Sequence, residues 1–206
     1  MIELLVATTN AGKFAEVQAF LSKLLLRIVS LRDLRDPPEI VEDGATFEAN
    51  ALKKARILAE HSGLLTLADD SGLEVDALSG APGIYSARYA GENGNDEKNN
   101  EKLLRELAAI PEEQRTARFV CALALCAPKS DCQRKWAVRE SCEGRIAFVL
   151  KGSNGFGYDP LFFYPSFGKT FGEIDQKTKS TVSHRGKALK KMTDILATLI
   201  DLPIQT

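Results

Sequence analysis

Residues 2–25 read IELLVATTNAGKFAEVQAFLSKLL, and this opening stretch indicates the class of fold. The apolar run Ile2–Ala7 has the length and composition of a buried strand. A polar loop follows over residues 8–12, and apolar side chains then recur at helical spacing over residues 14–25. A strand, a loop and a helix in this order are the building unit of α/β proteins, so we expect a fold of that class.

The rest of the chain continues the alternation of helices and strands. We expect further helices over residues 46–61 and 95–110 and from near residue 186. We expect strands over residues 64–68, 118–126, 135–141 and 145–150, the last of which follows Gly144 as a hairpin or as a bulged continuation. Residues 151–183 follow neither period, which indicates long loops with short elements. No repeat, low-complexity tract or linker interrupts residues 1–206, so we expect a single α/β domain.

The composition indicates a soluble globular protein. The 206 residues include 27 basic and 28 acidic side chains, so the net charge of −1 gives no broad electrostatic footprint for nucleic acid. No apolar run approaches the roughly 20 residues of a membrane helix. The first residues lack the basic start and apolar core of a secretory signal, and we therefore expect a cytoplasmic protein.

The cysteines also fit a reducing compartment. Cys121, Cys126, Cys132 and Cys142 include no C-x-x-C pair, and the chain has only 2 histidines. Because such a set makes a poor zinc site, we interpret the four residues as reduced thiols.

The loop after the first strand is the first of four polar clusters that are candidates for ligand binding. It reads Thr8-Thr9-Asn10-Ala11-Gly12-Lys13. Backbone N–H groups at the start of a helix favour phosphate, and Lys13 adds a positive charge. A Walker A loop is excluded, because Ala7 and Phe14 occupy its glycine and hydroxyl positions. A helix cap beside a solvated lysine is the alternative.

Carboxylates form the second cluster. Asp69-Asp70-Ser71-Gly72 directly follow the strand expected over residues 64–68. Carboxylate oxygens are ligands for Mg²⁺, and strand ends are where α/β folds bind their ligands. Neighbouring residues of an extended chain point to opposite sides, so we expect one of the two aspartates to face a ligand. An acidic turn is the alternative.

Two further groups lie upstream of these aspartates. The segment Glu42-Asp43-Gly44 can supply a second carboxylate ligand of the metal. Asn50 and Lys54 are four residues apart on a predicted helix, so they share a face that can meet phosphate oxygens. For Lys54, a solvated helix lysine is the alternative.

The third cluster is rich in glycine and aromatic residues and reads Gly152-Ser153-Asn154-Gly155-Phe156-Gly157-Tyr158-Asp159-Pro160. Glycines let the backbone approach a flat ligand. Phe156 or Tyr158 can stack on a base, and Asp159 can read the edge of that base. A turn with a purely structural role is the alternative.

The fourth cluster precedes the last helix and reads Lys179-Ser180-Thr181-Val182-Ser183-His184-Arg185-Gly186. Its two cations, Lys179 and Arg185, flank His184 and suit an anionic or carbonyl-bearing ligand. A structural histidine is the alternative.

Taken together and in this order, the clusters resemble the inosine triphosphate pyrophosphatase family over nearly the whole chain. Residues 8–13 carry the first part of the resemblance. The other motifs are Ala68-Asp69-Asp70-Ser71-Gly72-Leu73, Gly80-Ala81-Pro82-Gly83-Ile84-Tyr85-Ser86-Ala87-Arg88-Tyr89, Gly155-Phe156-Gly157-Tyr158-Asp159-Pro160 and Ser183-His184-Arg185-Gly186. Enzymes of this family hydrolyse inosine, deoxyinosine and xanthosine triphosphates.

The resemblance implies a homodimer whose fold is an elongated, mixed β-sheet with flanking helices and two lobes around a nucleotide-binding cleft. It also implies Mg²⁺ held by Asp70 and Glu42, with Asp70 as the proton acceptor. By the same resemblance, Lys13 and Lys54 act on the triphosphate together with Thr8, Thr9, Asn10, Ala11 and Gly12. The residues that match positions holding the nucleotide and its base are Ser71, Phe156, Gly157, Tyr158, Asp159, Lys179, His184 and Arg185.

Two other functions stay open at this point. A pyrophosphatase of related architecture for pyrimidine or modified nucleotides would share the phosphate and Mg²⁺ chemistry. A non-catalytic nucleotide sensor would retain the basic loops and the stacking residues, but it has no need of Asp70.

Overall fold

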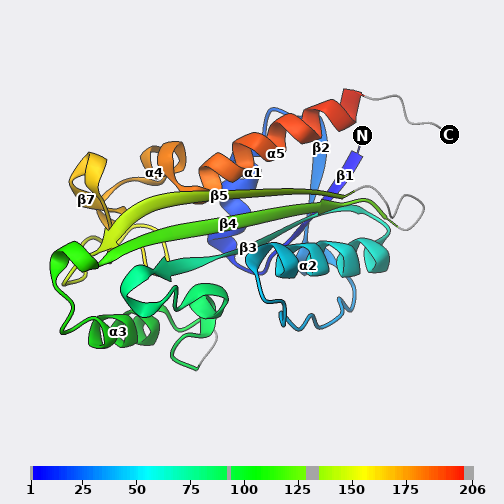
Figure 1. The fold of residues 1–206 in the computed structure, drawn as a ribbon. Coiled ribbons are helices and arrows are strands. Elements are labelled where there is room, and N and C mark those ends of the chain that lie inside the picture. Colours follow the sequence, from blue (N-terminus) through cyan, green and yellow to red (C-terminus); the bar gives the residue numbers. More distant parts are fainter. Residues whose placement is uncertain (1, 92–93, 129–134, 202–206) are drawn as a thin grey trace. The chain divides into compact units, whose positions relative to one another are not determined.

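The computed structural model describes residues 2–91, 94–128 and 135–201. Its strands form one 7-stranded sheet in the order β2-β1-β3-β4-β5-β6-β7 (Figure 1). β1 pairs in parallel with β2 and β3, whereas β6 pairs antiparallel with β5 and β7. The predicted mixed α/β fold with flanking helices is therefore confirmed. Within the described residues, none of the helices combines the length and apolar character that a membrane span requires.

The bounds of the elements are as follows. The strands are β1 (Ile2–Ala7), β2 (Leu26–Ser30), β3 (Leu65–Val75), β4 (Thr116–Cys126), β5 (Lys135–Ile146), β6 (Phe162–Tyr164) and β7 (Lys169–Thr170). The helices are α1 (Ala11–Leu21), α2 (Phe47–Ser62), α3 (Asp96–Glu106), α4 (Gln176–Val182) and α5 (His184–Asp201).

The chain consists of two compact units. Unit 1 comprises residues 1–70, 122–139 and 187–206, and unit 2 comprises residues 71–121 and 140–186. The boundaries fall inside β3, β4, β5 and α5, so each of these elements contributes residues to both units. Each unit contains its own buried apolar residues.

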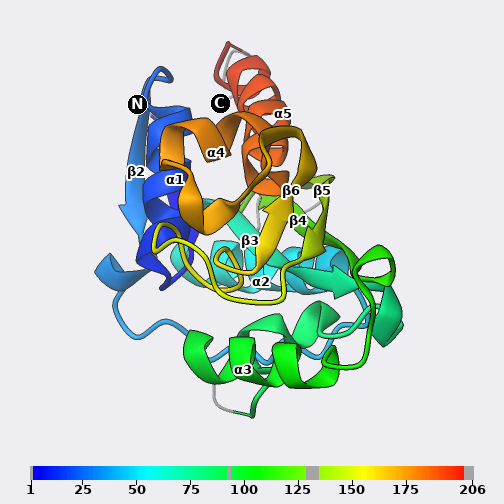
Figure 2. The same cartoon turned by 90° about the vertical axis from the view of Figure 1, so that its left-hand side faces the viewer.

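Unit 1 is built around β1, β2 and the first half of β3. Helix α2 lies on one face of these strands, and α1 and the later part of α5 lie on the other (Figures 1 and 2). The side chains of Ala51, Ala55 and Leu58 recur on one side of α2 and are buried there. Thr46 caps the start of this helix, and Gly63, at φ 70°, ends it in the left-handed conformation that glycine adopts readily.

Unit 2 has an aromatic core. The ring of Phe162 packs against Phe119 and Phe171, with centroid distances of 4.5 and 4.9 Å. Leu103 from α3 and Leu107 just after it join this core and are fully buried. Each such side chain contributes roughly 1.5–3 kcal/mol through burial.

A buried arginine connects the loops of unit 2. The guanidinium group of Arg115 donates hydrogen bonds to the carbonyl oxygens of Leu107, Ile110 and Ala147 at 2.7, 3.1 and 3.0 Å. Burial lowers the pKa of Arg115. The backbone oxygens take the place of water around its charge, so the segment between α3 and β4 and the segment after β5 are held together.

Besides the ends of α1 and α3, which fall at Leu21 and Glu106 rather than near residues 25 and 110, three of the expected boundaries are wrong. β3 does not end near residue 68 but continues to Val75, because its pairing with β1 stops at Ala68 while β4 stays its neighbour. Residues 135–141 and 145–150 do not form a hairpin: the strand continues through Gly144 as β5, and it ends at residue 146 rather than at residue 150. Gly144 permits close packing rather than a turn, since a Cβ there would meet the carbonyl oxygen of Phe163 at 2.6 Å.

The third difference lies at the last helix. α5 begins at His184, two residues before the expected start, because the hydroxyl of Ser183 accepts the N–H of Gly186 at 3.1 Å and caps the helix. β2 was not predicted at all. Of the four cysteines, Cys121, Cys126 and Cys142 are buried, and Cys132 lies outside the described residues.

Candidate active site

The register of the parallel strands brings the first two clusters together in unit 1. The last residue pair between β1 and β3 is Ala7 with Ala68. The residues that follow on the two strands therefore leave at the same edge, where α/β folds bind their ligands. There the ammonium group of Lys13 forms an ion pair with the carboxylate of Asp69, 56 residues away in the chain.

The loop over residues 8–13 leads into a capped helix. The side chain of Asn10 accepts the N–H of Lys13 at 3.0 Å, and the hydroxyl of Thr8 accepts the N–H of Asn10 at 3.1 Å. α1 thus starts at this edge with its positive end. The alternative of a helix cap is confirmed for Asn10, but Lys13 is not a solvated lysine, because its side chain is 18% exposed and paired with Asp69.

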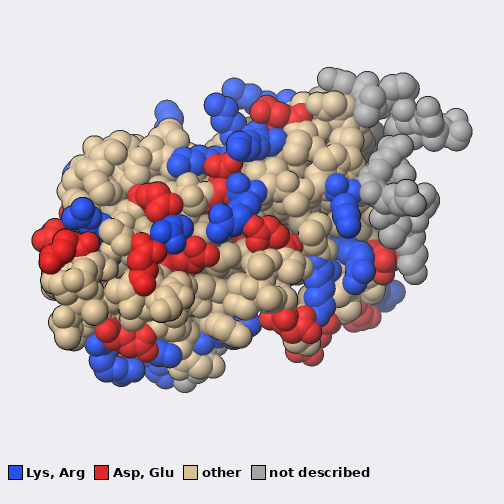
Figure 3. Space-filling model, viewed as in Figure 1, with Lys and Arg blue, Asp and Glu red and all other residues tan. Residues whose placement is uncertain are grey.

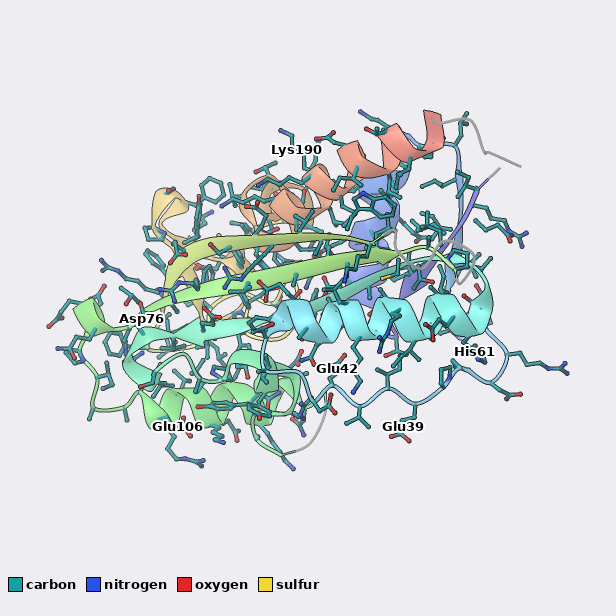
Figure 4. The ribbon with its side chains drawn as sticks, turned by 45° about the vertical axis from the view of Figure 1, so that its right-hand side comes forward. Glu39, Glu42, His61, Asp76, Glu106 and Lys190 are labelled. Carbon is teal, nitrogen blue, oxygen red and sulfur yellow. The ribbon has the colours of Figure 1, made fainter. Side chains whose placement is uncertain are left out.

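Lys54 on α2 contacts Asp69 as well, and it also pairs with Glu42. Its ammonium group pairs with the carboxylate of Glu42 and donates to the backbone carbonyl of Asp69 at 3.1 Å. Glu42 lies on the segment that runs alongside α2 (Figure 4). The alternative of a solvated helix lysine is therefore wrong for Lys54.

Asp70 is a buried acid whose negative charge is not offset by its surroundings. It is 7% exposed, and its Oδ2 atom has no hydrogen-bond partner among the residues that the structure describes. Burial raises the pKa of Asp70 to about 6, and the negative charge of Glu42 acts in the same direction. Lys54, Asn50 and Lys13 lower this pKa without offsetting the burial. An ionised Asp70 therefore favours a cation beside it. The alternative of an acidic turn is wrong, because Asp69 and Asp70 lie within β3.

The third and fourth clusters meet inside unit 2. Lys179 Nζ donates to Asp159 Oδ2 at 2.5 Å, and the two side chains are 3% and 2% exposed. The same oxygen accepts the N–H of Phe156 at 2.9 Å. Burial raises the pKa of Asp159, while Lys179 acts in the opposite direction. Gly155, at φ +77°, has no room for a side chain, because a Cβ would lie 1.9 Å from Asp159 Oδ2.

The two aromatic candidates of the third cluster differ in exposure. Tyr158 is buried and its hydroxyl donates to the carbonyl of Ser86 at 2.8 Å, so its ring belongs to the core and is not placed to stack on a base. Phe156 is partly exposed. Lys179 Nζ and Arg185 Cζ lie 5.1 and 5.5 Å from the centre of its ring. Phe156 is therefore the aromatic residue that can stack on a ligand.

His184 and Arg185 form the first turn of α5 and are both buried. The imidazole of His184 stacks on Phe119, with ring centroids 4.7 Å apart and planes tilted by 16°. Gly186 allows close approach to α4, because a Cβ there would lie 1.8 Å from the carbonyl oxygen of Ser180. The motif thus fixes the orientation of His184 by packing. Ser71 lies within β3 as the first residue of unit 2.

Two residues outside the predicted set hold the aromatic loop. Asn100 donates to the carbonyl of Gly157 at 3.0 Å, and Asp96 accepts the N–H of Gly157 at 2.7 Å. Both come from α3, the helix expected over residues 95–110, which supplied no functional candidate. Two adjacent asparagines, Asn99 and Asn100, are the signal that pointed to another role, because asparagine is unfavourable inside a helix unless its side chain is bonded elsewhere.

Carboxylates and lysines gathered at a strand edge of a mixed α/β fold are characteristic of proteins that bind phosphorylated ligands. The chain belongs to the Ham1 family, whose model matches residues 4–195. The predicted resemblance to nucleoside triphosphate pyrophosphatases is confirmed by its relatives.

Two relatives and one solved structure show how far the similarity extends. The dITP/XTP pyrophosphatase of Geobacter sulfurreducens is 51% identical over 196 residues, which cover 95% of this chain and 97% of that protein. The dITP/XTP pyrophosphatase of Exiguobacterium sibiricum is 50% identical, with 97% and 99% covered. The structure of a HAM1 protein from Coxiella burnetii matches with a TM-score of 0.87 and 40% identity, covering 96% of this chain and 100% of that one.

Proposed function

We propose that this chain is a Mg²⁺-dependent pyrophosphatase that converts the non-standard purine nucleotides ITP, dITP and XTP to the monophosphate and pyrophosphate. Relatives that are 51% and 50% identical carry the name dITP/XTP pyrophosphatase. The observation that carries the chemistry is the acidic and basic cluster of unit 1, where Asp70 and Glu42 interact with Lys54, and Lys13 also acts on Asp70. This hydrolysis requires carboxylates for a cation and lysines for phosphate.

The acidic side chains of unit 1 fit a magnesium ion. Among the described residues, no three or more His, Cys, Asp or Glu side chains form a complete protein-only metal site. Mg²⁺ does not need one, because one or two carboxylates hold it while water and substrate phosphates complete its octahedral shell. Asp70, whose buried Oδ2 has no partner in the described chain, would hold the ion together with Glu42. The bound ion supplies charge neutralisation at the phosphates and a lower pKa for a nearby water.

The triphosphate is proposed to lie against the start of α1. Its binding residues there are Thr8, Thr9, Asn10, Ala11 and Gly12, which bring backbone N–H groups and the positive helix end. Lys13 and Lys54 are proposed to stabilise the negative charge that collects on the departing pyrophosphate. Since both lysines now pair with carboxylates, substrate binding exchanges those partners for phosphate oxygens.

The residues of unit 2 are proposed to hold the nucleoside and to read its base. They are Ser71, Phe156, Gly157, Asp159, Lys179, His184 and Arg185. Tyr158 supports this loop from the core, through its hydrogen bond to the carbonyl of Ser86. Hypoxanthine and xanthine carry a 6-oxo acceptor where adenine has an amino donor. Donors from His184, Arg185 or the backbone would be left unpaired with ATP, which disfavours it.

The family resemblance also supports a homodimer in the cytoplasm. On the face that Figure 3 shows, basic and acidic side chains of the described residues are interspersed, which supports a small-molecule substrate rather than nucleic acid. Light scattering checks the dimer, whose expected mass is twice the 22.5 kDa of the chain.

A panel of nucleoside triphosphates, assayed with and without Mg²⁺ and with both products identified, tests the proposal. We expect ITP, dITP and XTP to give pyrophosphate faster than ATP or GTP does, and only with Mg²⁺ present. Preference for dTTP or UTP would instead favour the pyrimidine enzyme. Release of orthophosphate would show that the bond between the α-phosphorus and the bridging oxygen is not the one that is cut. Nucleotide binding without product formation, unchanged in Asp70→Asn, would favour the non-catalytic sensor.

A further inference from the structure

β2, the strand that the sequence did not predict, brings a further segment to the edge of the sheet where β1 ends. The last residue pair between the two strands is Val6 with Ser30, and β1 ends one residue later, at Ala7. Because the strands are parallel, the chain leaves both of them at the same edge. Residues 31–33 therefore begin close to the loop over residues 8–13.

The short helical turn over Leu31–Asp33 holds the backbone of Arg32 in place. The hydroxyl of Ser30 accepts the N–H of Arg32 at 3.2 Å, and the carboxylate of Asp33 accepts the N–H of Ser30 at 3.2 Å. From this turn the side chain extends to the loop, where Nη2 of Arg32 donates to the carbonyl oxygen of Thr9 at 2.9 Å. Both ends of the arginine are thus positioned beside the loop.

Most of the hydrogen-bonding capacity of Arg32 is unused. A guanidinium group carries five N–H donors in a fixed fork. Among the described residues, the carbonyl of Thr9 is the one acceptor that this side chain meets, and no carboxylate there pairs with it. The side chain is also exposed. Arg32 therefore offers a full positive charge and several donors to a ligand at the loop.

The two lysines of the site are committed to carboxylates, in contrast to Arg32. Lys13 pairs with Asp69, and Lys54 pairs with Glu42. Together with Asp70 these groups are three carboxylates against two ammonium groups, a net charge of −1 when all are ionised. A bound Mg²⁺ raises this to +1, which is less than the several negative charges of a triphosphate require. A further cation at the loop supplies part of the difference.

Arg32 and the carboxylate of Asp70 lie on opposite sides of the loop. The sheet order is β2-β1-β3, so β1 lies between the strand before Arg32 and the strand that contains Asp70. Neighbouring strands are about 4.8 Å apart, which places β2 and β3 roughly 10 Å from each other. A triphosphate with its α-phosphorus on the side of Asp70, lying across the start of α1, extends its terminal phosphate towards Arg32.

We propose that Arg32 binds the terminal phosphate of the substrate and makes the protein prefer triphosphates to diphosphates, an inference that rests on the proposed pyrophosphatase function. The guanidinium group keeps its hydrogen bond to Thr9 and directs its other N–H groups to the phosphate oxygens, to which arginine donates two parallel hydrogen bonds. A diphosphate lacks this phosphate and gains nothing from the contact. Arg32 is thus a specificity-determining residue that takes no part in bond cleavage.

The hydrogen bond to Thr9 suggests one competing role, in which Arg32 only fixes the loop. The carbonyl of Thr9 and the N–H of Asn10 belong to the same peptide group, and the hydroxyl of Thr8 accepts that N–H at 3.1 Å. Loss of the loop conformation would weaken the binding of triphosphates and diphosphates alike. Loss of a contact to the terminal phosphate weakens the binding of triphosphates alone.

Calorimetric titration of the α,β-methylene analogues of ITP and IDP, with Mg²⁺ present, separates the two roles. We expect Arg32→Ala to raise the Kd of the ITP analogue by about tenfold or more, and to change the Kd of the IDP analogue by less than about threefold. Because Arg32 is exposed, the variant should fold as the wild type does.

Arg35→Ala is the matched control, because it removes the same charge from the same exposed segment. Within the described chain, the side chain of Arg35 has no hydrogen bond or ion pair, and only its backbone carbonyl contacts another residue, His61. We expect Arg35→Ala to change the Kd of either analogue by less than about threefold. A rise in the Kd of the ITP analogue equal to that in Arg32→Ala would overturn the proposal, since it would show an effect of net charge alone.

Two further results would overturn the proposal: an equal rise in both Kd values in Arg32→Ala, or no rise in the Kd of the ITP analogue. Arg32→Gln removes the charge and keeps a donor for the carbonyl of Thr9, so we expect it to weaken the ITP analogue as Arg32→Ala does. Wild-type affinity in Arg32→Gln would show that Arg32 only fixes the loop.

Inorganic tripolyphosphate tests the same contact without a base. We expect Arg32→Ala to weaken its binding by about tenfold or more, and unchanged binding would contradict the proposal. Formation of IMP and pyrophosphate from ITP by the wild-type protein tests the proposed function separately, because the binding measurements need no turnover.

Discussion

Replacement of Asp70 by Asn is expected to stabilise the metal-free protein while it abolishes turnover. Burial and the nearby Glu42 raise the pKa of Asp70 from 3.8 to about 6, so the folded state binds a proton there more tightly than the unfolded state does. The ionised carboxylate therefore costs stability, and this cost is absent below about pH 4, grows as the pH rises and is complete above about pH 6. The difference between the two pKa values corresponds to roughly 3 kcal/mol.

Asn has the shape of Asp without the charge. In urea denaturation with EDTA, Asp70→Asn should be more stable than the wild type at about pH 8, by up to roughly 3 kcal/mol, and equally stable near pH 4. Turnover should be lost almost completely, because the variant lacks the carboxylate for the metal and the water, while nucleotide binding persists. A variant that is less stable at pH 8, or a difference that does not change with pH, would refute the reasoning.

Asp43→Asn is the matched control, because the environment of Asp43 lowers its pKa, whereas that of Asp70 raises it. A hydrogen bond from Lys53 lowers the pKa of Asp43 at an exposed position. A lowered pKa contributes stability at neutral pH that is lost as the pH falls through the folded value. The control should therefore show a slight loss of stability at neutral pH and none in acid.

The remaining predictions concern both units. Lys13→Ala should lose at least tenfold in kcat/KM for ITP, about 1.4 kcal/mol, and a wild-type rate would remove its role at the phosphates. His184→Ala should narrow the ratio of ITP to ATP hydrolysis, and an unchanged ratio would exclude it from base reading. Lys179→Ala leaves Asp159 buried without its cation and should cost about 3–5 kcal/mol in denaturant unfolding, whereas near-wild-type stability would contradict the buried pair.

Local sequence patterns predicted most of the elements but not β2. Leu24, Leu25 and Leu26 fit the end of a helical stripe as well as the start of a strand. The choice is made by parallel pairing with β1, which aligns Leu26 with Ile2, and such long-range pairing leaves no local signal. The end of β3 was missed for a similar reason. Polar residues after Ala68 are typical of a turn, but Lys13 and Lys54 provide partners for Asp69 inside the strand.

The sequence predicted which residues belong to the candidate site but not which of them contact one another. The loop over residues 8–13, the acidic segments around Glu42 and Asp70, and Lys54 were identified from their chemistry, whereas the choice of Asp70 and Glu42 as metal ligands came from the family resemblance. The structure brings these residues into one cluster of unit 1. The pairing of Lys13 with Asp69 depends on strand register, which spacing alone does not determine. The sequence does not predict the burial of Tyr158 either, because the partner of its hydroxyl is a backbone carbonyl 72 residues away.

Hydrolysis of ITP in ¹⁸O-labelled water, followed by mass spectrometry of both products, tests most directly the claim that water attacks the α-phosphorus and pyrophosphate departs. The label should appear in IMP, the pyrophosphate should be unlabelled, and Asp70→Asn should incorporate almost none. Label in pyrophosphate, or labelled orthophosphate as the product, would contradict the proposed chemistry.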